Sequence, residues 1–258
     1  MLLAIDSGNT NIVFAVFDDA GDIQGKWRSS TTSERTADEY GIWLAQLMEM
    51  SKIARSDISH AIIASVVPAT VFSLKTLCRT YFDCEPLIVG ENNIDLGLNV
   101  LVDNPEEVGD DRLVSAVAAY EQFGGPLIVV DFGTATTFDV IGKGGNYRGG
   151  VIAPGVNLSL EALHRAAAKL PRVAIERPEK VVGQATVPAM QSGIFWGYIS
   201  MIEGLVRRIS DEIGLEPKVI ATGGLSPLFT EFTDAINESA PDLTLRGLYS
   251  IHKRNLPE

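Results

Sequence analysis

Hydrophobic and polar positions divide the start of the chain into two apolar runs separated by a short polar segment. Residues 2–5 form a continuous apolar run that is typical of a buried strand, and residues 12–17 form a second run rich in β-branched and aromatic side chains. The polar segment between them reads Asp6-Ser7-Gly8-Asn9-Thr10-Asn11. The pattern therefore predicts a β-hairpin with an acid at the end of its first strand.

The turn of this hairpin has a composition that suits a phosphate group. A short turn of small hydroxyl and amide residues directs backbone N–H groups and hydroxyls towards one point. The carboxylate of Asp6 beside the turn suits a Mg²⁺ ion carried by that phosphate. An ordinary hairpin with an Asx-type turn accounts for the same residues, so both interpretations remain open for this stretch alone.

The same pattern occurs a second time at residues 127–141. Asp131-Phe132-Gly133-Thr134 aligns with Asp6-Ser7-Gly8-Asn9, and each acid follows one β run and precedes another. Two such hairpins predict a duplicated unit. Two facing turns could bind the phosphates of one nucleotide from both sides, and the second carboxylate would give a second cation site.

The rest of the chain alternates between helical and strand patterns, which indicates an α/β fold with helices on both faces of a sheet. A capping box formed by Thr36 and Glu39 begins a helix with apolar residues at helical spacing. Further helices are expected at residues 70–81, 111–123, 158–169, 188–213 and 227–237, and further strands at residues 25–29, 60–65, 87–89, 218–222 and 243–245. We expect a domain boundary near residue 117, which divides the chain into residues 1–117 and 118–258.

Composition narrows the class of protein. The formal net charge of -12 argues against a protein that binds duplex nucleic acid or an anionic membrane. Cys78 and Cys84 lack C-x-x-C spacing, and we expect them to be reduced thiols of a cytoplasmic protein. The sequence shows no signal-peptide pattern and no apolar run of the roughly 20 residues that span a membrane.

The order of motifs resembles the layout of the actin-like, sugar-kinase-like ATPases: two D-x-G hairpins come first, and a late strand leads into Thr222-Gly223-Gly224. In those proteins the glycine pair at this position lets the backbone approach the adenosine. A narrower resemblance, to the type III pantothenate kinases, covers residue 1 to about residue 250. Some of that family are described as Baf-type accessory factors. The motifs that carry it are Asp6-Ser7-Gly8-Asn9-Thr10, Gly109-Asp110-Asp111-Arg112, Asp131-Phe132-Gly133-Thr134-Ala135-Thr136-Thr137 and Met190-Gln191-Ser192-Gly193.

The resemblance implies a fold and a reaction. The expected fold is α/β, with duplicated ribonuclease-H-like domains of the actin-like ATPase kind and a nucleotide cleft between them. The expected activity is the ATP-dependent phosphorylation of pantothenate to 4'-phosphopantothenate, the first step of coenzyme A synthesis. Members of the family resemble one another in needing Mg²⁺ and a monovalent cation, K⁺ or NH₄⁺, and in forming homodimers.

The resemblance also implies roles for residues that face ATP and its cations. Asp131 matches the ligand of the monovalent cation, Thr134 matches an ATP contact, and Asp6 lies near the Mg²⁺ ion. The residues that match the ATP phosphate loop are Asp6, Ser7, Gly8, Asn9, Thr10, Asn11, Ile12 and Val13. A turn residue at the end of a strand remains the alternative interpretation of Asp131.

The pantothenate side is implied by Gly109-Asp110-Asp111-Arg112 and by Thr186. Asp111 matches the proton acceptor and Arg112 a substrate-binding arginine. A carboxylate within reach of the substrate hydroxyl can take its proton, and the neighbouring Arg112 favours the ionised acid. The alternative for Asp110 and Asp111 is a helix N-cap.

The chain departs from the family pattern in two places. The family usually has alanine where this chain has Asp110, and a second acid could raise the pKa of the base or only face solvent. Many members have tyrosine where this chain has Val102, which puts one substrate contact in doubt.

Two other functions fit the same fold. One is a non-catalytic accessory or regulatory protein, but the acids Asp6, Asp111 and Asp131 are all present, and a retired site would tend to lose them. The other is a kinase or phosphatase that acts on a sugar or acetate, and the loop at residues 109–112 argues against it.

Overall fold

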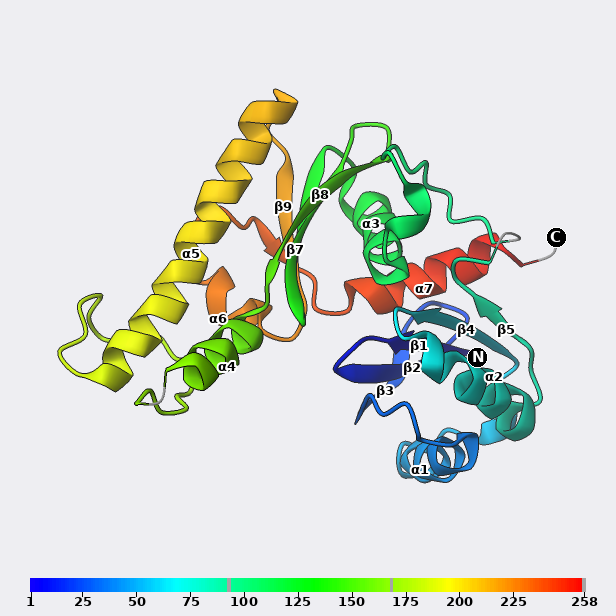
Figure 1. Cartoon of the computed structure of the whole chain (residues 1–258). Coiled ribbons are helices and arrows are strands. Elements are labelled where there is room, and N and C mark those ends of the chain that lie inside the picture. The colour runs from blue at the N-terminus through cyan, green and yellow to red at the C-terminus, as the bar shows by residue number, and fades with distance from the viewer. Residues whose placement is uncertain (92–93, 168, 257–258) are drawn as a thin grey trace. The chain divides into compact units, whose positions relative to one another are not determined.

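The computed structural model describes residues 1–91, 94–167 and 169–256, which contain two five-stranded mixed sheets (Figure 1). Contacts along the chain divide it into two compact units. The first unit contains Met1–Asn99, Asp103–Glu121 and the segment from Leu243, and the second contains Val100–Val102 and Gln122–Asp242.

The sheet of the first unit has the strand order β3-β2-β1-β4-β5. Its strands are β1 (Leu2–Ser7), β2 (Asn11–Phe17), β3 (Ile23–Ser30), β4 (His60–Ser65) and β5 (Pro86–Ile88). Its helices are α1 (Ala37–Met50), α2 (Pro68–Phe82), α3 (Asp110–Phe123) and α7 (Leu243–Arg254), with short 3₁₀ helices at Arg55–Asp57 and Pro105–Glu107. The central strand β1 is antiparallel to β2 and parallel to β4.

Alternation along β1 explains why helices cover both faces of this sheet. Leu3 and Ile5 belong to a core that includes side chains of α1 and α2. Leu2 and Ala4 point to the opposite face, where the core includes side chains of α3 and α7. The strand is therefore apolar at nearly every position until Asp6.

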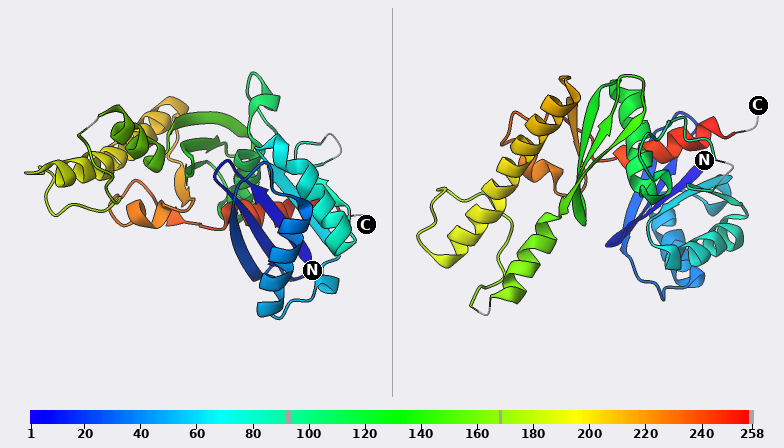
Figure 2. Two further views of the ribbon diagram at one scale, coloured as in Figure 1. Left: turned by 60° about the horizontal axis from the view of Figure 1, so that its bottom comes forward. Right: turned by 45° about the horizontal axis from the view of Figure 1, so that its top comes forward.

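The sheet of the second unit repeats this arrangement, with the order β10-β9-β6-β7-β8. Its strands are β6 (Leu127–Phe132), β7 (Ala135–Ile141), β8 (Tyr147–Pro154), β9 (Lys218–Thr222) and β10 (Glu238–Ser239). Its helices are α4 (Val156–Ala166), α5 (Thr186–Ile213) and α6 (Ser226–Thr230). The long helix α5 runs along one face of this sheet, as the views of Figure 2 show, because its apolar side chains share a core with those of β6.

The two sheets place their acids in equivalent positions, which confirms the predicted duplication. Asp6 is the last residue but one of β1, opposite Val13 on β2 and Ala64 on β4. Asp131 is the last residue but one of β6, opposite Thr137 on β7 and Thr222 on β9. The predicted α/β fold class is therefore confirmed within each unit.

Most predicted elements are found, and the capping box of α1 is confirmed: the N–H of Thr36 donates to Glu39 Oε2 (2.8 Å), and the N–H of Glu39 donates to Thr36 Oγ1 (3.3 Å). Helix α4 ends at Ala166, before the predicted end at residue 169, and residue 168 of that prediction lies outside the described residues.

Two predictions at the end of the chain are wrong. Residues 243–245 begin the helix α7 instead of forming a strand, because Leu245, Leu248 and Ile251 recur at helical spacing and form one buried face. The helix predicted at residues 227–237 stops at Thr230. Beyond it, Thr233 Oγ1 accepts from the N–H of Ala235 (3.2 Å), a local turn that competes with helix.

The unit limits also differ from the boundary expected near residue 117. That position lies inside α3, and the contacts divide the chain after Glu121. The segment from Leu243 groups with the first unit because α7 packs on β1 and β4.

Candidate active site

The turn between β1 and β2 contains the accessible part of the predicted phosphate loop. The N–H of Gly8 donates to the carbonyl of Asn11 (3.0 Å), and Asn9 and Thr10 are exposed at the tip. Asp6 and Val13 are half-buried, opposite one another at the base of the hairpin. These residues can face a ligand.

Two residues of the same predicted loop are instead buried. Ile12 is part of the apolar core. The hydroxyl of Ser7 is also buried and lies 2.8 Å from Thr70 Oγ1, which itself donates to the carbonyl of Val67 (2.9 Å). Because Thr70 gives its proton to Val67, Ser7 donates to Thr70. This hydrogen bond connects the end of β1 to the first turn of α2. The sequence analysis did not identify Thr70 as part of the site. The feature that could have revealed it is its position two residues after Pro68, in the first turn of that helix.

The first turn of α3 carries Asp111 to this same end of the sheet. The N–H of Arg112 donates to Asp111 Oδ1 (2.8 Å) and to the carbonyl of Gly109 (3.0 Å). A Cβ on Gly109 would lie 2.7 Å from Asp111 Oδ1 and 3.5 Å from Val66 Cγ1. The carboxylate of Asp111 therefore folds over Gly109, close to Val66.

Val66 in turn connects this loop to the phosphate turn. Its N–H donates to the carbonyl of Ser7 (3.1 Å), the last residue of β1. Ser7 ends β1 and Val66 follows β4, so both lie at the carboxyl ends of these parallel strands, where α/β folds bind their ligands. The structure thus brings the predicted proton acceptor and the predicted phosphate turn to one edge of one sheet.

Asp110 and Asp111 both lie in the first turn of α3, where the helix dipole stabilises negative charge. Burial, and then the negative charge of Asp111, raise the pKa of Asp110 to about 6. The carboxylate of Asp110 packs on Gly90, whose φ is +89°, and a Cβ on Gly90 would lie 3.0 Å from Asp110 Oδ1. The second acid therefore does not merely face solvent: its carboxyl group packs on Gly90, and its own pKa is raised.

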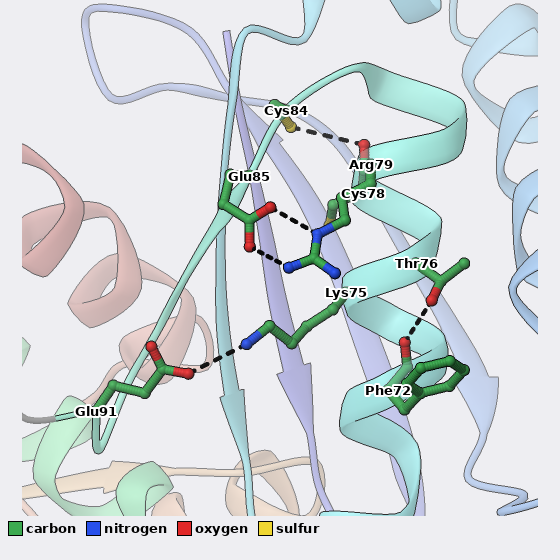
Figure 3. Close-up of polar contacts among 8 residues, drawn as sticks. All are labelled: Phe72, Lys75, Thr76, Cys78, Arg79, Cys84, Glu85 and Glu91. Carbon is green, nitrogen blue, oxygen red and sulfur yellow. Dashed lines mark hydrogen bonds and ion pairs between the residues drawn. The ribbon is translucent and has the colours of Figure 1, made fainter.

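Two ion pairs join α2 to the residues on either side of β5 (Figure 3). Arg79 pairs with Glu85 through two hydrogen bonds, of 2.6 and 2.7 Å, just before β5. Lys75, one turn earlier on α2, pairs with Glu91 (3.2 Å) just after β5. The pairs flank β5, and Gly90, which contacts Asp110, directly precedes the paired Glu91.

Figure 3 also shows the two cysteines on this side of α2. Cys84 Sγ contacts the carbonyl of Cys78 at 3.9 Å. Burial raises the pKa of both thiols, which keeps them protonated and unreactive, as expected for structural cysteines.

Asp131 of the second unit packs closely against Gly223. Gly223 follows β9 with φ at +87°, and a Cβ on it would overlap Asp131 Oδ1 and lie 2.7 Å from the N–H nitrogen of Phe132. Hydroxyl residues Thr137 and Thr222 lie opposite Asp131 on the two neighbouring strands. A carboxylate with threonine hydroxyl residues on both sides is a set of oxygen donors that fits a monovalent cation.

The remaining predicted residues lie elsewhere in the second unit. Thr134 is exposed in the β6–β7 turn. Thr186 is the exposed first residue of α5. Val102, where the family often has tyrosine, is half-buried, and its Cγ1 lies 3.6 Å from the position of a Cβ on Gly149.

A pocket of about 610 Å³ lies apart from these residues, between α1 and Tyr81 of α2. It is lined by side chains such as Ile42, Gln46, Lys52 and Arg55 and by no predicted site residue. We therefore base the site on the residues at the strand ends. Over residues 1–91, 94–167 and 169–256, no helix combines the length and the apolar character needed to span a membrane.

Comparison with known proteins identifies the family. The family model for type III pantothenate kinase matches residues 2–208. The chain belongs to the type III pantothenate kinase family. A type III pantothenate kinase from Paramagnetospirillum magneticum is 69% identical over 99% of this chain and 98% of the relative. One from Rhodospirillum rubrum is 63% identical over 100% of both chains. The family predicted from the motifs is thus confirmed.

Solved structures share the fold at much lower identity. A protein from Campylobacter jejuni described as a Baf family transcriptional activator has a TM-score of 0.60 and 19% identity, over 98% of both chains. The activator of 2-hydroxyisocaproyl-CoA dehydratase from Clostridium difficile, solved with bound ADPNP, has a TM-score of 0.53 and 11% identity, over 100% of this chain and 98% of that chain.

Proposed function

We propose that this member of the family transfers the γ-phosphoryl group of ATP to the hydroxyl of pantothenate and so forms 4'-phosphopantothenate. The observation that carries the proposal is the position of Asp111, whose carboxylate folds over Gly109 beside Val66, one hydrogen bond away from the end of β1. A proton acceptor and a phosphate-binding turn at one sheet edge are what phosphoryl transfer to an alcohol requires.

Asp111 is the proposed general base. Its place in the first turn of α3 favours the ionised carboxylate that this role requires. The carboxylate accepts the proton of the pantothenate hydroxyl as the new oxygen–phosphorus bond forms, while the bond to ADP breaks. Arg112 is proposed to bind the carboxylate or the amide oxygens of pantothenate, and Thr186 to make a further substrate contact.

The turn at Gly8, Asn9, Thr10 and Asn11 is proposed to bind the ATP phosphates through N–H groups and hydroxyls. Asp6 fits Mg²⁺, because that ion is usually held by one or two carboxylates together with substrate phosphates. The ion would neutralise phosphate charge during transfer.

Asp131 is the proposed ligand of K⁺ or NH₄⁺, supported by the threonines opposite it on both neighbouring strands and by the lack of a side chain on Gly223. A cation there would lower the cost of placing phosphate charge near a carboxylate. Thr134 is proposed as an ATP contact because it is exposed in the turn that repeats the phosphate turn of the first unit.

A homodimer is also proposed. Helix α4 buries only Val156 of its own residues, although its sequence is rich in leucine. Apolar side chains are exposed in β8, α4, the loop before α5 and the start of α5: Ile152, Leu158, Leu163, Val181, Val182 and Val187. A second copy of the chain could cover such side chains. Because the reaction uses ATP and a small metabolite, we place it in the cytoplasm.

A non-catalytic regulatory protein is the second candidate, favoured by the fold shared with the protein described as a transcriptional activator. Phosphoryl transfer separates the two candidates. ADP release should be measured with ATP, Mg²⁺ and K⁺ in the presence of pantothenate, pantetheine, glucose or acetate. We expect release with pantothenate well above the other three. No stimulation by any acceptor would favour the regulatory protein, and stimulation by glucose or acetate would contradict the assigned substrate.

A further inference from the structure

Thr31 lies outside every motif discussed so far, yet it contacts the phosphate turn twice. It is the first residue after β3. Its hydroxyl Oγ1 donates to the carbonyl of Gly8 (2.6 Å), and its N–H donates to the carbonyl of Thr10 (3.0 Å). One residue therefore binds two carbonyl groups of a turn that is only Gly8, Asn9 and Thr10 long.

These two hydrogen bonds fix which way the peptide groups of the turn face. In a trans peptide the carbonyl of one residue and the N–H of the next point in opposite directions. With the carbonyls of Gly8 and Thr10 held towards Thr31, the N–H groups of Asn9 and Asn11 are directed to the other side. Two N–H groups directed the same way form a site for an anion, whereas carbonyls on that side would repel it.

The segment that carries Thr31 is itself firmly held. The guanidinium of Arg35 donates to the hydroxyl of Ser29 and stacks over the rings of Tyr40 (4.5 Å) and Trp43 (5.2 Å) on α1. The N–H of Arg35 also donates to the carbonyl of Thr32 (3.2 Å). Thr31 can therefore position the turn rather than follow its movements.

The duplicated unit offers an internal comparison. Gly155 is the first residue after β8, the position that Thr31 has after β3. A Cβ on Gly155 would lie 2.7 Å from the carbonyl oxygen of Gly133 and would overlap that of Thr134. The second turn thus leaves no room for a side chain at this position, and only the first turn has a hydroxyl donor there.

We infer that Thr31 is a positioning residue of the ATP phosphate turn, which sets the turn so that its N–H groups face the nucleotide phosphates. The inference rests on the proposed function of that turn. Nucleotide affinity should therefore depend on Thr31, although Thr31 lies in another segment of the chain, and pantothenate affinity should not.

The test compares wild-type protein with Thr31→Val, which keeps the shape and removes the hydroxyl, and with Thr31→Ser, which keeps the hydroxyl. Thr32→Val is the matched control, because Thr32 is the exposed neighbour. KM for ATP and for pantothenate, kcat, and the Kd of MgADP by calorimetry should be measured. Thr31→Ala is a second variant without the hydroxyl, in case Thr31→Val folds poorly by circular dichroism.

We expect Thr31→Val to raise KM for ATP and Kd for MgADP about fivefold, the usual effect of one lost hydrogen bond. KM for pantothenate should be unchanged, and Thr31→Ser and Thr32→Val should bind as the wild type does. Unchanged nucleotide affinity in Thr31→Val and Thr31→Ala would overturn the inference, as would an equal rise in both KM values. A wild type that binds MgADP but transfers no phosphate to pantothenate would contradict the proposed function instead.

Discussion

Gly223 and Asp131 are packed so closely that no side chain fits on the glycine. A Cβ there would overlap Asp131 Oδ1, and the backbone of Gly223 has a φ of +87° that side chains disfavour. The sequence interpretation assigned this glycine to a close approach of the backbone to adenosine. The contact in the structure is with the carboxylate proposed to hold the monovalent cation, so Gly223 and the cation site depend on one another.

The cation proposal predicts that activity depends on K⁺ or NH₄⁺. Turnover should be measured against KCl at constant ionic strength, with NaCl or a bulky organic cation as the balance. We expect turnover in Na⁺ alone to fall by roughly tenfold or more, because the smaller Na⁺ holds its hydration shell more tightly and does not replace K⁺ among the oxygen ligands of such a site. Asp131→Asn should lower activity and weaken the response to K⁺. A flat response in the wild type would mean that Asp131 has another role.

Gly223→Ala should disturb the same site through packing. The added methyl group must displace the carboxylate of Asp131, and a shift of about 1 Å in such a group can cost on the order of 100-fold in rate. Gly214→Ala is the control, since Gly214 also has a positive φ (+63°) but has nothing within 4 Å of a Cβ. Both variants carry the cost of a positive φ, and Gly223→Ala carries in addition the cost of its contacts with Asp131 and the backbone of Phe132. Only Gly223→Ala should need more KCl for half-maximal activity. Equal KCl dependence in the two would show that packing on Asp131 is unimportant.

Asp6→Ala should impair the use of MgATP while the protein stays folded. The side chain of Asp6 is half-buried at the end of β1, so its loss leaves the core of the sheet intact. At limiting Mg²⁺ we expect the apparent KM for MgATP to rise by roughly tenfold, as one charge-assisted ligand is lost. Wild-type kinetics at limiting Mg²⁺ would remove Asp6 from the metal site.

Asp110 should make stability fall as the pH rises from about 4 to about 6. Its pKa in the folded protein is about 6, above the ordinary value near 3.8, because of burial and the charge of Asp111. Below pH 4 the acid is protonated in both states. Between pH 4 and 6 the unfolded chain loses the proton first, so rising pH favours unfolding, and above pH 6 the cost is complete.

Asp110→Asn removes this cost. The free energy of unfolding of Asp110→Asn minus that of the wild type should be larger at pH 7 than at pH 4 by about 1 kcal/mol. This figure allows for the partial exposure of the carboxylate. Urea unfolding at several pH values measures the difference, and Asp103→Asn, at an exposed acid, is the control. A difference between Asp110→Asn and wild type that stays constant with pH would contradict the raised pKa.

Local patterns predicted most of the fold. Strands β4 and β9 were located to the residue, because apolar runs bounded by turns leave few alternatives. Helix α7 was missed, since its Gly247 and polar residues obscure the helical spacing of its leucines. Only the structure shows that Gly247 packs on the carbonyl of Val114, where a side chain would not fit.

The site could be predicted only as far as its motifs extend along the chain. The motif could name Ser7 and Ile12 as loop residues, but their burial depends on Thr70 and on the core, which come from other segments. The contact of Asp110 with Gly90 and the hydrogen bonds of Thr31 join residues about 20 positions apart or more, so no local pattern reveals them.

The central claim is that Asp111, and not the neighbouring acid, accepts the proton of the pantothenate hydroxyl. The most direct measurement is kcat with saturating ATP and pantothenate for Asp111→Asn and Asp110→Asn, together with the Kd of MgADP. We predict that Asp111→Asn lowers kcat on the order of 10²- to 10⁴-fold with nucleotide affinity unchanged, and that Asp110→Asn stays within about tenfold of wild type. Near-normal turnover in Asp111→Asn, with the large loss in Asp110→Asn, would contradict the account.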